Sequence, residues 1–129
     1  TRHFVGVKRL THETMYAPET KREAVAQSAY NIDIHSGVKD HIDLTPVAEP
    51  FGIPYGCLVP ESLNGLLLSG RTISVDTQVF ASARVMGPCI AVGEAAGTAA
   101  AMSVDKGIEL RDVDVDALRA TLRENGNLF

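Results

Sequence analysis

The fold expected of this chain is decided by Leu66-Leu67-Leu68-Ser69-Gly70-Arg71. The leucine run, bounded by Asn64-Gly65 and Gly70, predicts a short strand that is buried on both faces and ends in a glycine turn. The polar residues after it predict a loop. Further on, Gly93-Glu94-Ala95-Ala96-Gly97-Thr98-Ala99-Ala100-Ala101 predicts a helix with one flank reduced to hydrogens and methyl groups. This combination predicts an α/β fold in which a large flat ligand lies across a helix N-terminus.

The helix that contains the small-residue run is expected to have Pro88 in its first turn and to end near Gly107. Proline fits there because its missing N–H would have no helical partner in the first turn. We therefore expect the amides from Gly87 to Ile90, apart from Pro88, to point outward from the positive end of the helix dipole. Such amides can meet a carbonyl oxygen or a developing negative charge. The alternative is a helix start satisfied by water or by Ser82.

Two glycines inside the same helix indicate a close approach to its backbone. Gly93 and Gly97 are four residues apart, and Ala96 and Ala100 extend the same narrow face. A glycine inside a helix costs roughly 1 kcal/mol relative to alanine, so two of them indicate that something comes very near. A strand, another helix or a ligand would each explain the pattern, and tight packing of the helix on a sheet is the alternative to a ligand.

Residues 1–50 predict a strand, a helix, a second strand and a loop. Loose alternation over residues 2–10 predicts a half-exposed strand. Pro18 in a first helical turn, with charged residues after it, predicts a helix through Gln27. Alternation over residues 30–35 predicts the second strand, and the polar composition of residues 38–49 predicts a loop.

The C-terminal part has two further signals. Glycines and prolines between residues 51 and 60 predict an irregular or edge strand, because proline cannot donate to a ladder. The last helix is expected to be capped by Asp114 and to end at Asn125-Gly126.

Composition excludes several classes of protein. The chain has 129 residues, of which 45% are hydrophobic, and 12 basic against 16 acidic residues give a net charge of −4. It lacks a Lys/Arg cluster that would follow a phosphate backbone, and the run of about 20 apolar residues that a membrane span needs. Cys57 and Cys89 do not form the dense framework of a secreted domain. We expect one cytoplasmic domain with reduced thiols and without nucleic-acid or membrane partners.

Metal and hydrolase chemistry have no matching pattern. Ligand-type residues occur close together, but their spacing matches no standard zinc or calcium site, so no metal is expected and a solvated acidic loop is preferred. Those residues are Asp33, His35, Asp40, His41 and Asp43. None of the serines lies in the Gly-x-Ser-x-Gly context of a hydrolase. Cys89, near a helix start, is either a reactive thiol or a small buried one.

Several motifs together carry a resemblance to a known family. They are Leu67-Leu68-Ser69-Gly70-Arg71-Thr72-Ile73-Ser74, Ala81-Ser82-Ala83-Arg84-Val85-Met86, Gly93-Glu94-Ala95-Ala96-Gly97-Thr98-Ala99-Ala100, Tyr55-Gly56-Cys57-Leu58-Val59-Pro60 and Asp33-Ile34-His35. They resemble the C-terminal flavin-binding segment of FAD-dependent oxidoreductases with a glutathione-reductase-like fold, in the branch related to fumarate reductase.

The resemblance implies where an FAD cofactor would lie. Gly70 and Arg71 would lie near its ribityl and pyrophosphate region, and the helix with Gly93 and Gly97 would lead away from the flavin. The pyrimidine edge, whose N1 and C2 oxygen carry negative charge in the reduced flavin, would be lined by Val85, Met86, Gly87, Pro88 and Cys89. Hydride transfer would be the chemistry of the cofactor, and the protein would orient it.

One departure from the family pattern limits this implication. Such enzymes resemble one another in an N-terminal Gly-x-Gly-x-x-Gly turn, and no two glycines of this chain are two residues apart. We therefore expect the C-terminal portion of a longer flavoprotein, inactive alone. Its fold would be a partial α/β fold with helices packed on a small mixed sheet, without the N-terminal Rossmann unit. Within one domain, residues 1–50 would precede a flavin-contacting segment and C-terminal helices over 51–129.

Two residues are candidates for catalysis on an unknown small molecule. Arg84 would face the substrate or clamp the flavin, and His35, held by Asp33, would donate a proton because histidine titrates near neutrality. The alternative for Asp33 and His35 is an ordinary surface strand. A second hypothesis for the whole chain is a non-catalytic domain without cofactor that self-associates through the small-residue helix and the loop at 38–49. As a fragment, the chain is expected to form homo-oligomers.

Overall fold

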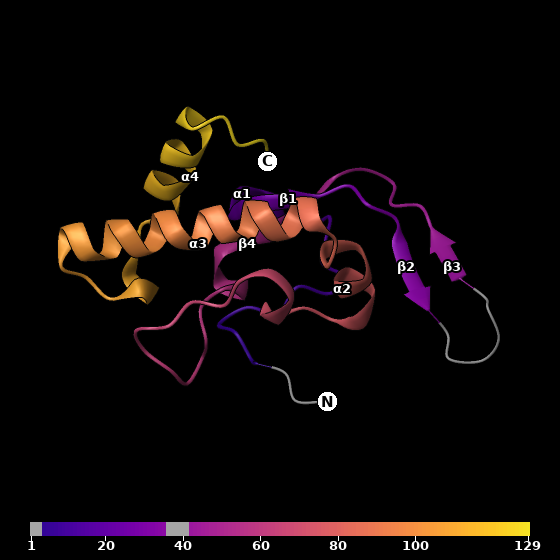
Figure 1. Ribbon diagram of the computed structural model, residues 1–129, viewed down its shortest axis with the longest axis horizontal. Helices are drawn as coiled ribbons and strands as arrows, with labels where there is room; N and C mark the ends of the chain where they lie inside the picture. Colours follow the sequence, from indigo (N-terminus) through magenta and orange to yellow (C-terminus); the bar gives the residue numbers. More distant parts are fainter. Residues whose placement is uncertain (1–3, 36–41) are drawn as a thin grey trace.

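The computed structural model of the chain describes residues 4–35 and 42–129 and has a mixed α/β architecture (Figure 1). In the described part, the helices are α1 (Pro18–Arg22), α2 (Thr77–Ala83), α3 (Met86–Lys106) and α4 (Val115–Glu124). The strands are β1 (Ala24–Ser28), β2 (Ile32–His35), β3 (Ile42–Thr45) and β4 (Phe51–Pro54). Short 3-10 turns lie at Tyr55–Cys57, Gly70–Thr72 and Leu110–Asp112. The expected α/β class is confirmed.

The strands form two antiparallel pairs. β1 pairs with β4, and Ser28 lies opposite Phe51. β2 pairs with β3, and Asp33 lies opposite Leu44. The first pair lies against α3, whereas the β2–β3 ribbon extends beyond the N-terminal end of α3 and rests on α2 (Figure 1).

The core forms where α3 crosses the β1–β4 pair. α3 buries Val92, Ala95 and Ala99 almost completely, and it packs on β1, α4 and the turn at Gly70–Thr72. Small side chains on this face let the helix and the sheet approach closely. Around them lies one continuous cluster of buried side chains that includes Leu10, Met15, Val25, Phe51, Ile53, Leu58, Val79, Leu118 and Leu122.

Two predicted helix ends and two predicted strands are confirmed. The Asp114 carboxylate accepts hydrogen bonds from the N–H groups of Asp116 and Ala117 at the start of α4. α3 ends at Gly107, whose φ of 63° is the left-handed conformation that favours glycine. The strand expected within residues 30–35 is β2, and the strand expected after residue 50 is β4, which belongs to a two-stranded sheet.

The helix expected from Pro18 through Gln27 is too long. α1 ends at Arg22, and the chain continues directly into β1. The residues from Ala24 to Ala26 are buried between β4 and α3, so pairing with a distant strand overrides their local helix preference.

Three expectations about strands and loops are wrong. Residues 66–68 form no strand, and Leu66 is exposed. Their one main-chain hydrogen bond among the described residues runs from the Leu68 N–H to the Leu58 carbonyl, at 2.7 Å. The described part of the strand expected at 2–10 makes only the isolated bridges Gly6 to Pro60 and Leu10 to Val75. The loop expected at 38–49 contains β3, and residues 38–41 lie outside the described residues.

A buried arginine joins the end of the chain to its beginning. The Arg119 side chain is only 8% exposed, and its Nη1 donates to the carbonyls of Lys21, Arg22 and Ala24, at 2.9 Å for the first and the last. Burial, and then the neighbouring charge of Arg123, lower the pKa of Arg119. These bonds satisfy carbonyls at the end of α1 and tie α4 to β1.

We predict that Arg119→Met lowers the free energy of unfolding by about 2–4 kcal/mol, because it leaves the buried Ala24 carbonyl and the partly buried carbonyls of Lys21 and Arg22 without their charged donor. Arg123→Met is the matched control: both guanidinium groups lie over the Phe129 ring, at 5.2 and 5.1 Å, but Arg123 is exposed. The control should change the free energy by no more than about 0.5 kcal/mol. Urea unfolding measures both, and equal losses would contradict the role given to Arg119.

Candidate functional site

The site expected from the sequence lies where α2 and α3 meet. The axes of the two helices are bent by 94° at the short break between Ala83 and Met86. Among the described residues no single helix has the length and apolar composition to cross a membrane, and only this bent pair passes when taken together. The bend brings the last residue of one helix and the first of the next to one place, next to β2 (Figure 1). We call this place the α2–α3 corner and define it by Asp33, His35, Arg71, Arg84 and residues 85–87.

Arg84 connects three parts of the corner. Its Nη2 donates to the main-chain carbonyl of Asp33 at 3.0 Å and lies 3.6 Å from the Asp33 Oδ2. Its own carbonyl, at the end of α2, accepts a hydrogen bond from the Nε of Arg71 at 3.2 Å. Arg84 thus holds β2, the end of α2 and the turn at Gly70–Thr72 together, and its side chain stays 31% exposed.

His35 shares the Asp33 carboxylate with Arg84. The His35 Nε2 lies 3.2 Å from Oδ1 and 3.3 Å from Oδ2 of Asp33. The imidazole is 57% exposed, whereas the Asp33 side chain is 16% exposed. The two side chains are neighbours because residues i and i+2 of a strand point to the same face. The fold therefore brings both catalytic candidates of the sequence, Arg84 and His35, onto one acid.

The free amides at the start of α3 are fewer than expected. The Cys89 N–H donates to the Val85 carbonyl at 3.2 Å, so it already belongs to the helix, and the expectation of open amides as far as Ile90 is wrong. The N–H groups of Met86 and Gly87 precede this first bond and have no acceptor among the described residues. Met86 is 80% exposed, and Val85 provides no side-chain cap. Two amides thus point outward at a positive helix end.

Ser82 does not cap this helix. It is fully buried, its Oγ donates to the Tyr30 carbonyl at 2.5 Å, and it lies 2.9 Å from the Ser28 Oγ. These bonds fasten α2 to the segment between β1 and β2. The alternative of a helix start satisfied by Ser82 is therefore wrong. Ser82 instead fixes the position of α2 through its bonds to Tyr30 and Ser28.

The glycines of α3 lie on its open side. A Cβ built on Gly97 or Gly87 would meet no atom within 4 Å, and one on Gly93 would lie 3.6 Å from the Ser69 Oγ, an ordinary contact. Tight packing on the sheet uses the face with Ala95 and Ala99 instead, so sheet packing does not explain these glycines.

We predict that Gly97→Ala raises the free energy of unfolding of this chain by about 0.5–1 kcal/mol, because a helical site with open space gains helix propensity. Ala101→Gly, at an exposed position one turn further along α3, is the matched control and should lower it by a similar amount. Thermal or urea unfolding gives both values. A loss of stability in Gly97→Ala would mean that a part of this chain already occupies that face.

The remaining predicted residues lie around the corner rather than in it. Gly70 adopts φ 59° at the start of its turn, a conformation that favours glycine. Pro88 is buried in the first turn of α3, as expected. Cys89 is half-buried, with its Sγ 3.6 Å from the Ala83 carbonyl. Among the described residues no group of three or more His, Cys, Asp or Glu side chains is placed to hold a metal ion. Asp40 and His41, and the side chain of Asp43, lie outside the described residues.

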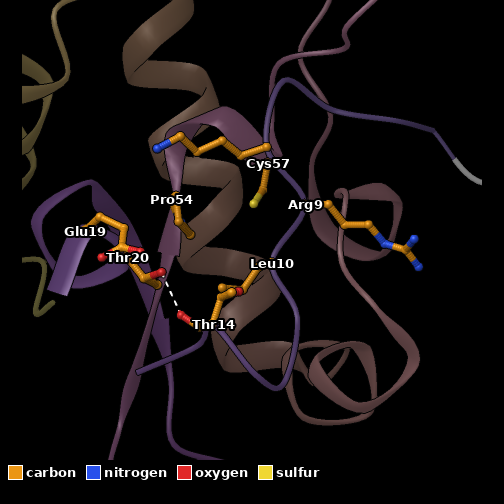
Figure 2. Close-up of a pocket in the computed structure, with 8 residues that line it drawn as sticks. Arg9, Leu10, Thr14, Glu19, Thr20, Pro54 and Cys57 are labelled. Carbon is orange, nitrogen blue, oxygen red and sulfur yellow. Dashed lines mark hydrogen bonds between the residues drawn. The ribbon is translucent and has the colours of Figure 1, made fainter. Parts of the chain in front are cut away.

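A small cavity that the sequence did not predict lies at the other end of the β1–β4 pair (Figure 2). Its volume is about 190 Å³, and its lining residues are Lys8, Arg9, Leu10, Thr14, Glu19, Thr20, Pro54 and Cys57. Figure 2 shows the Cys57 sulfur directed inward and the Arg9 side chain directed away. Ligand sites usually measure roughly 300–1,000 Å³, so this cavity is too small for a flat three-ring ligand.

Both cysteines are free thiols, and their surroundings differ. Burial is the main cause that raises the pKa of the Cys57 thiol to about 12; a hydrogen bond with the Leu10 backbone and the charge of Lys8 lower it, and the charge of Glu23 raises it. We predict that a thiol reagent such as Ellman's reagent at pH 8 modifies Cys89 before Cys57 in the folded protein, because a thiol far below its pKa holds very little thiolate.

Cys89→Ser and Cys57→Ala separate the two rates. Cys89→Ser should slow the reaction at least about tenfold, and Cys57→Ala should leave the fast phase unchanged. A fast phase that survives in Cys89→Ser would contradict the inert environment assigned to Cys57.

The structure is that of an α/β protein in which one helix begins with free amides. Two arginines and an aspartate–histidine pair lie beside this helix start at the α2–α3 corner. The family model for FAD dependent oxidoreductases matches residues 1–122, which include the whole corner. The chain therefore belongs to the FAD dependent oxidoreductase family. No curated protein and no solved structure matches it.

Proposed function

We propose that this chain is the C-terminal flavin-binding portion of a longer FAD-dependent oxidoreductase. Family membership over residues 1–122, in a sequence without a Gly-x-Gly-x-x-Gly turn, is the observation that carries the proposal. On this view the phosphate-binding half of the cofactor site belongs to another part of the protein. We further propose that the parent has a glutathione-reductase-like fold of the branch related to fumarate reductase, and that it works in the cytoplasm on a small molecule.

The corner has the chemistry that a flavin edge requires. The N–H groups of Met86 and Gly87 are free, Gly87 has no side chain to block approach, and Arg84 and Arg71 place positive charge beside them. Donors at a helix N-terminus favour an anion, and the reduced flavin concentrates negative charge at N1 and the C2 oxygen. We propose that these two amides hold that edge, with Gly70 and Arg71 toward the ribityl and pyrophosphate portion. When bound, FAD supplies hydride transfer.

Two side chains of the corner are proposed to act on the substrate. Arg84 is anchored through Nη2, so its remaining N–H donors are available to an anionic group of a ligand. His35 has an exposed imidazole that contacts the carboxylate of Asp33, and it is the proposed proton donor. Both side chains lie within 3.6 Å of the Asp33 carboxylate, so the guanidinium and the proposed proton donor are close to one another.

A specific observation favours the second candidate function, self-association without cofactor. Along the open side of α3, Met86, Ile90 and Val104 are 80%, 70% and 81% exposed, although all are large and apolar. Exposed apolar surface of this kind commonly drives pairing. The two candidates differ in what covers this face: a flavin and the remainder of a flavoprotein, or a second copy.

The test is an FAD titration of the full-length protein, followed by flavin absorbance and melting temperature. We predict a shifted flavin spectrum and a raised melting temperature in the wild type. Gly87→Leu should weaken FAD binding at least about tenfold, because its side chain would occupy the space in front of the free amides. Ala120→Leu, at an exposed position of α4, is the control and should bind FAD as the wild type does.

Two outcomes would contradict the proposal. Equal FAD affinity in Gly87→Leu and the wild type would remove the helix start from the cofactor site. A flat titration in the full-length protein, together with a defined dimer by light scattering, would favour the self-association function instead.

A further inference from the structure

We infer that Asp33 is a positioning residue that orients both Arg84 and His35 at the α2–α3 corner. This inference rests on the proposed function, because it concerns the two side chains assigned there to the substrate. Asp33 itself is not assigned contact with flavin or substrate: its side chain is 16% exposed, and the groups nearest to it are the guanidinium and the imidazole.

The first observation is that Asp33 holds one nitrogen of Arg84 at two points. The main-chain carbonyl accepts a hydrogen bond from Nη2 at 3.0 Å, and the carboxylate Oδ2 lies 3.6 Å from the same nitrogen. The Nη1 and Nε of Arg84 have no acceptor among the described residues. A guanidinium fixed at one end and free at the other presents its remaining donors in a defined direction.

The second observation is that the same carboxylate faces His35. Both carboxylate oxygens lie within 3.3 Å of the His35 Nε2. A hydrogen bond to one ring nitrogen fixes the ring and leaves the other nitrogen for exchange of a proton with a ligand. The charged and titratable groups facing the Asp33 carboxylate in the described part are thus His35 on its own strand and Arg84 from the end of α2.

The third observation is that Asp33 has unused acceptor capacity in an enclosed position. Its Oδ1 is buried and makes no hydrogen bond of acceptable geometry with a described residue. A buried polar atom without a hydrogen bond is uncommon and costs stability, so it requires an explanation. Here the explanation is the position of the carboxylate, whose Oδ1 lies 3.2 Å from the His35 Nε2 and whose Oδ2 lies 3.6 Å from the Arg84 Nη2, so that one acid restrains both side chains.

The experiment compares Asp33→Asn with the wild type and reads Arg84 by NMR of its guanidinium nitrogens, without flavin. In the wild type we expect separate, slowly exchanging Nη signals from the anchored group. Asn keeps the shape and the hydrogen bond to the main-chain carbonyl but removes the charge of the carboxylate, so the Nη signals should exchange faster than in the wild type. Asp105→Asn, an exposed carboxylate near the end of α3, is the control and should leave the Arg84 signals unchanged.

A second readout uses FAD affinity of the full-length protein in a double-mutant cycle. Arg84 also places positive charge beside the two amides proposed to hold the flavin edge, so FAD affinity reports on its position. Asp33→Asn should weaken FAD binding about tenfold, whereas the same change should have little further effect when Arg84 is already Gln, because Asp33 acts through Arg84. Asp33→Glu, which keeps the charge, should restore part of the affinity. If Asp33→Asn does not fold, Asp33→Glu is compared with the wild type by the same NMR readout and should change the exchange of the Arg84 Nη signals. Arg84→Lys, which has no guanidinium to observe, is then used only in the FAD affinity measurement and should weaken binding.

The outcomes separate the inference from the function on which it rests. Unchanged Arg84 Nη signals, or equal losses of FAD affinity in the wild-type and Arg84→Gln backgrounds, would overturn the positioning role even in a protein that binds FAD. Absence of FAD binding in the wild type would contradict the proposed function, while the NMR comparison would still decide whether Asp33 orients Arg84.

Discussion

Close packing of α3 on the β1–β4 pair is the constraint on which the rest of the structure depends. Ala95 and Ala99 are completely buried there, and Val92 nearly so. Methyl-sized side chains bring the helix axis near the sheet, and larger ones would push it outward. Because α3 is fixed along its length, the position of its first residue is fixed as well. The 94° bend then determines where α2 ends and which residue of β2 it meets.

The open side of the same helix gives this packing its functional meaning. A helix with apolar residues around its circumference is characteristic of the interior of a protein. α3 is buried on one side, and on the other it exposes Ile90 and Val104 together with Gly87 and Gly97, where an added Cβ would meet no atom within 4 Å. The proposal of a longer flavoprotein accounts for both sides: one packs on the sheet of this chain, and the other faces the cofactor and further protein.

The sequence predicted what local chemistry determines. Asp114 and Gly107 mark helix ends through a carboxylate cap and a left-handed residue, and both are where they were expected. Alternation correctly placed Asp33 and His35 on one strand face. Long-range pairing could not be predicted in this way: the helix pattern continues through Ala24–Ala26, and only the arrival of β4 makes these residues a strand.

In the candidate site, too, local features were predictable from the sequence and long-range contacts were not. The motif around Arg84 and the start of α3 were recognisable from residue types, but the hydrogen bond from Arg84 to the Asp33 carbonyl joins residues 51 positions apart. The Arg71 bond to the Arg84 carbonyl likewise depends on the path of the intervening chain. The leucine run was expected to form a buried strand and instead leaves Leu66 in solvent, since no strand within residues 4–35 and 42–129 lies beside it to complete a ladder. A crystal structure of the FAD-loaded full-length protein would show directly whether the start of α3 holds the flavin. We expect the amide nitrogens of Met86 and Gly87 to lie within about 3.2 Å of the flavin N1 or C2 oxygen. A flavin bound elsewhere, with these two amides facing water or protein, would contradict this expectation.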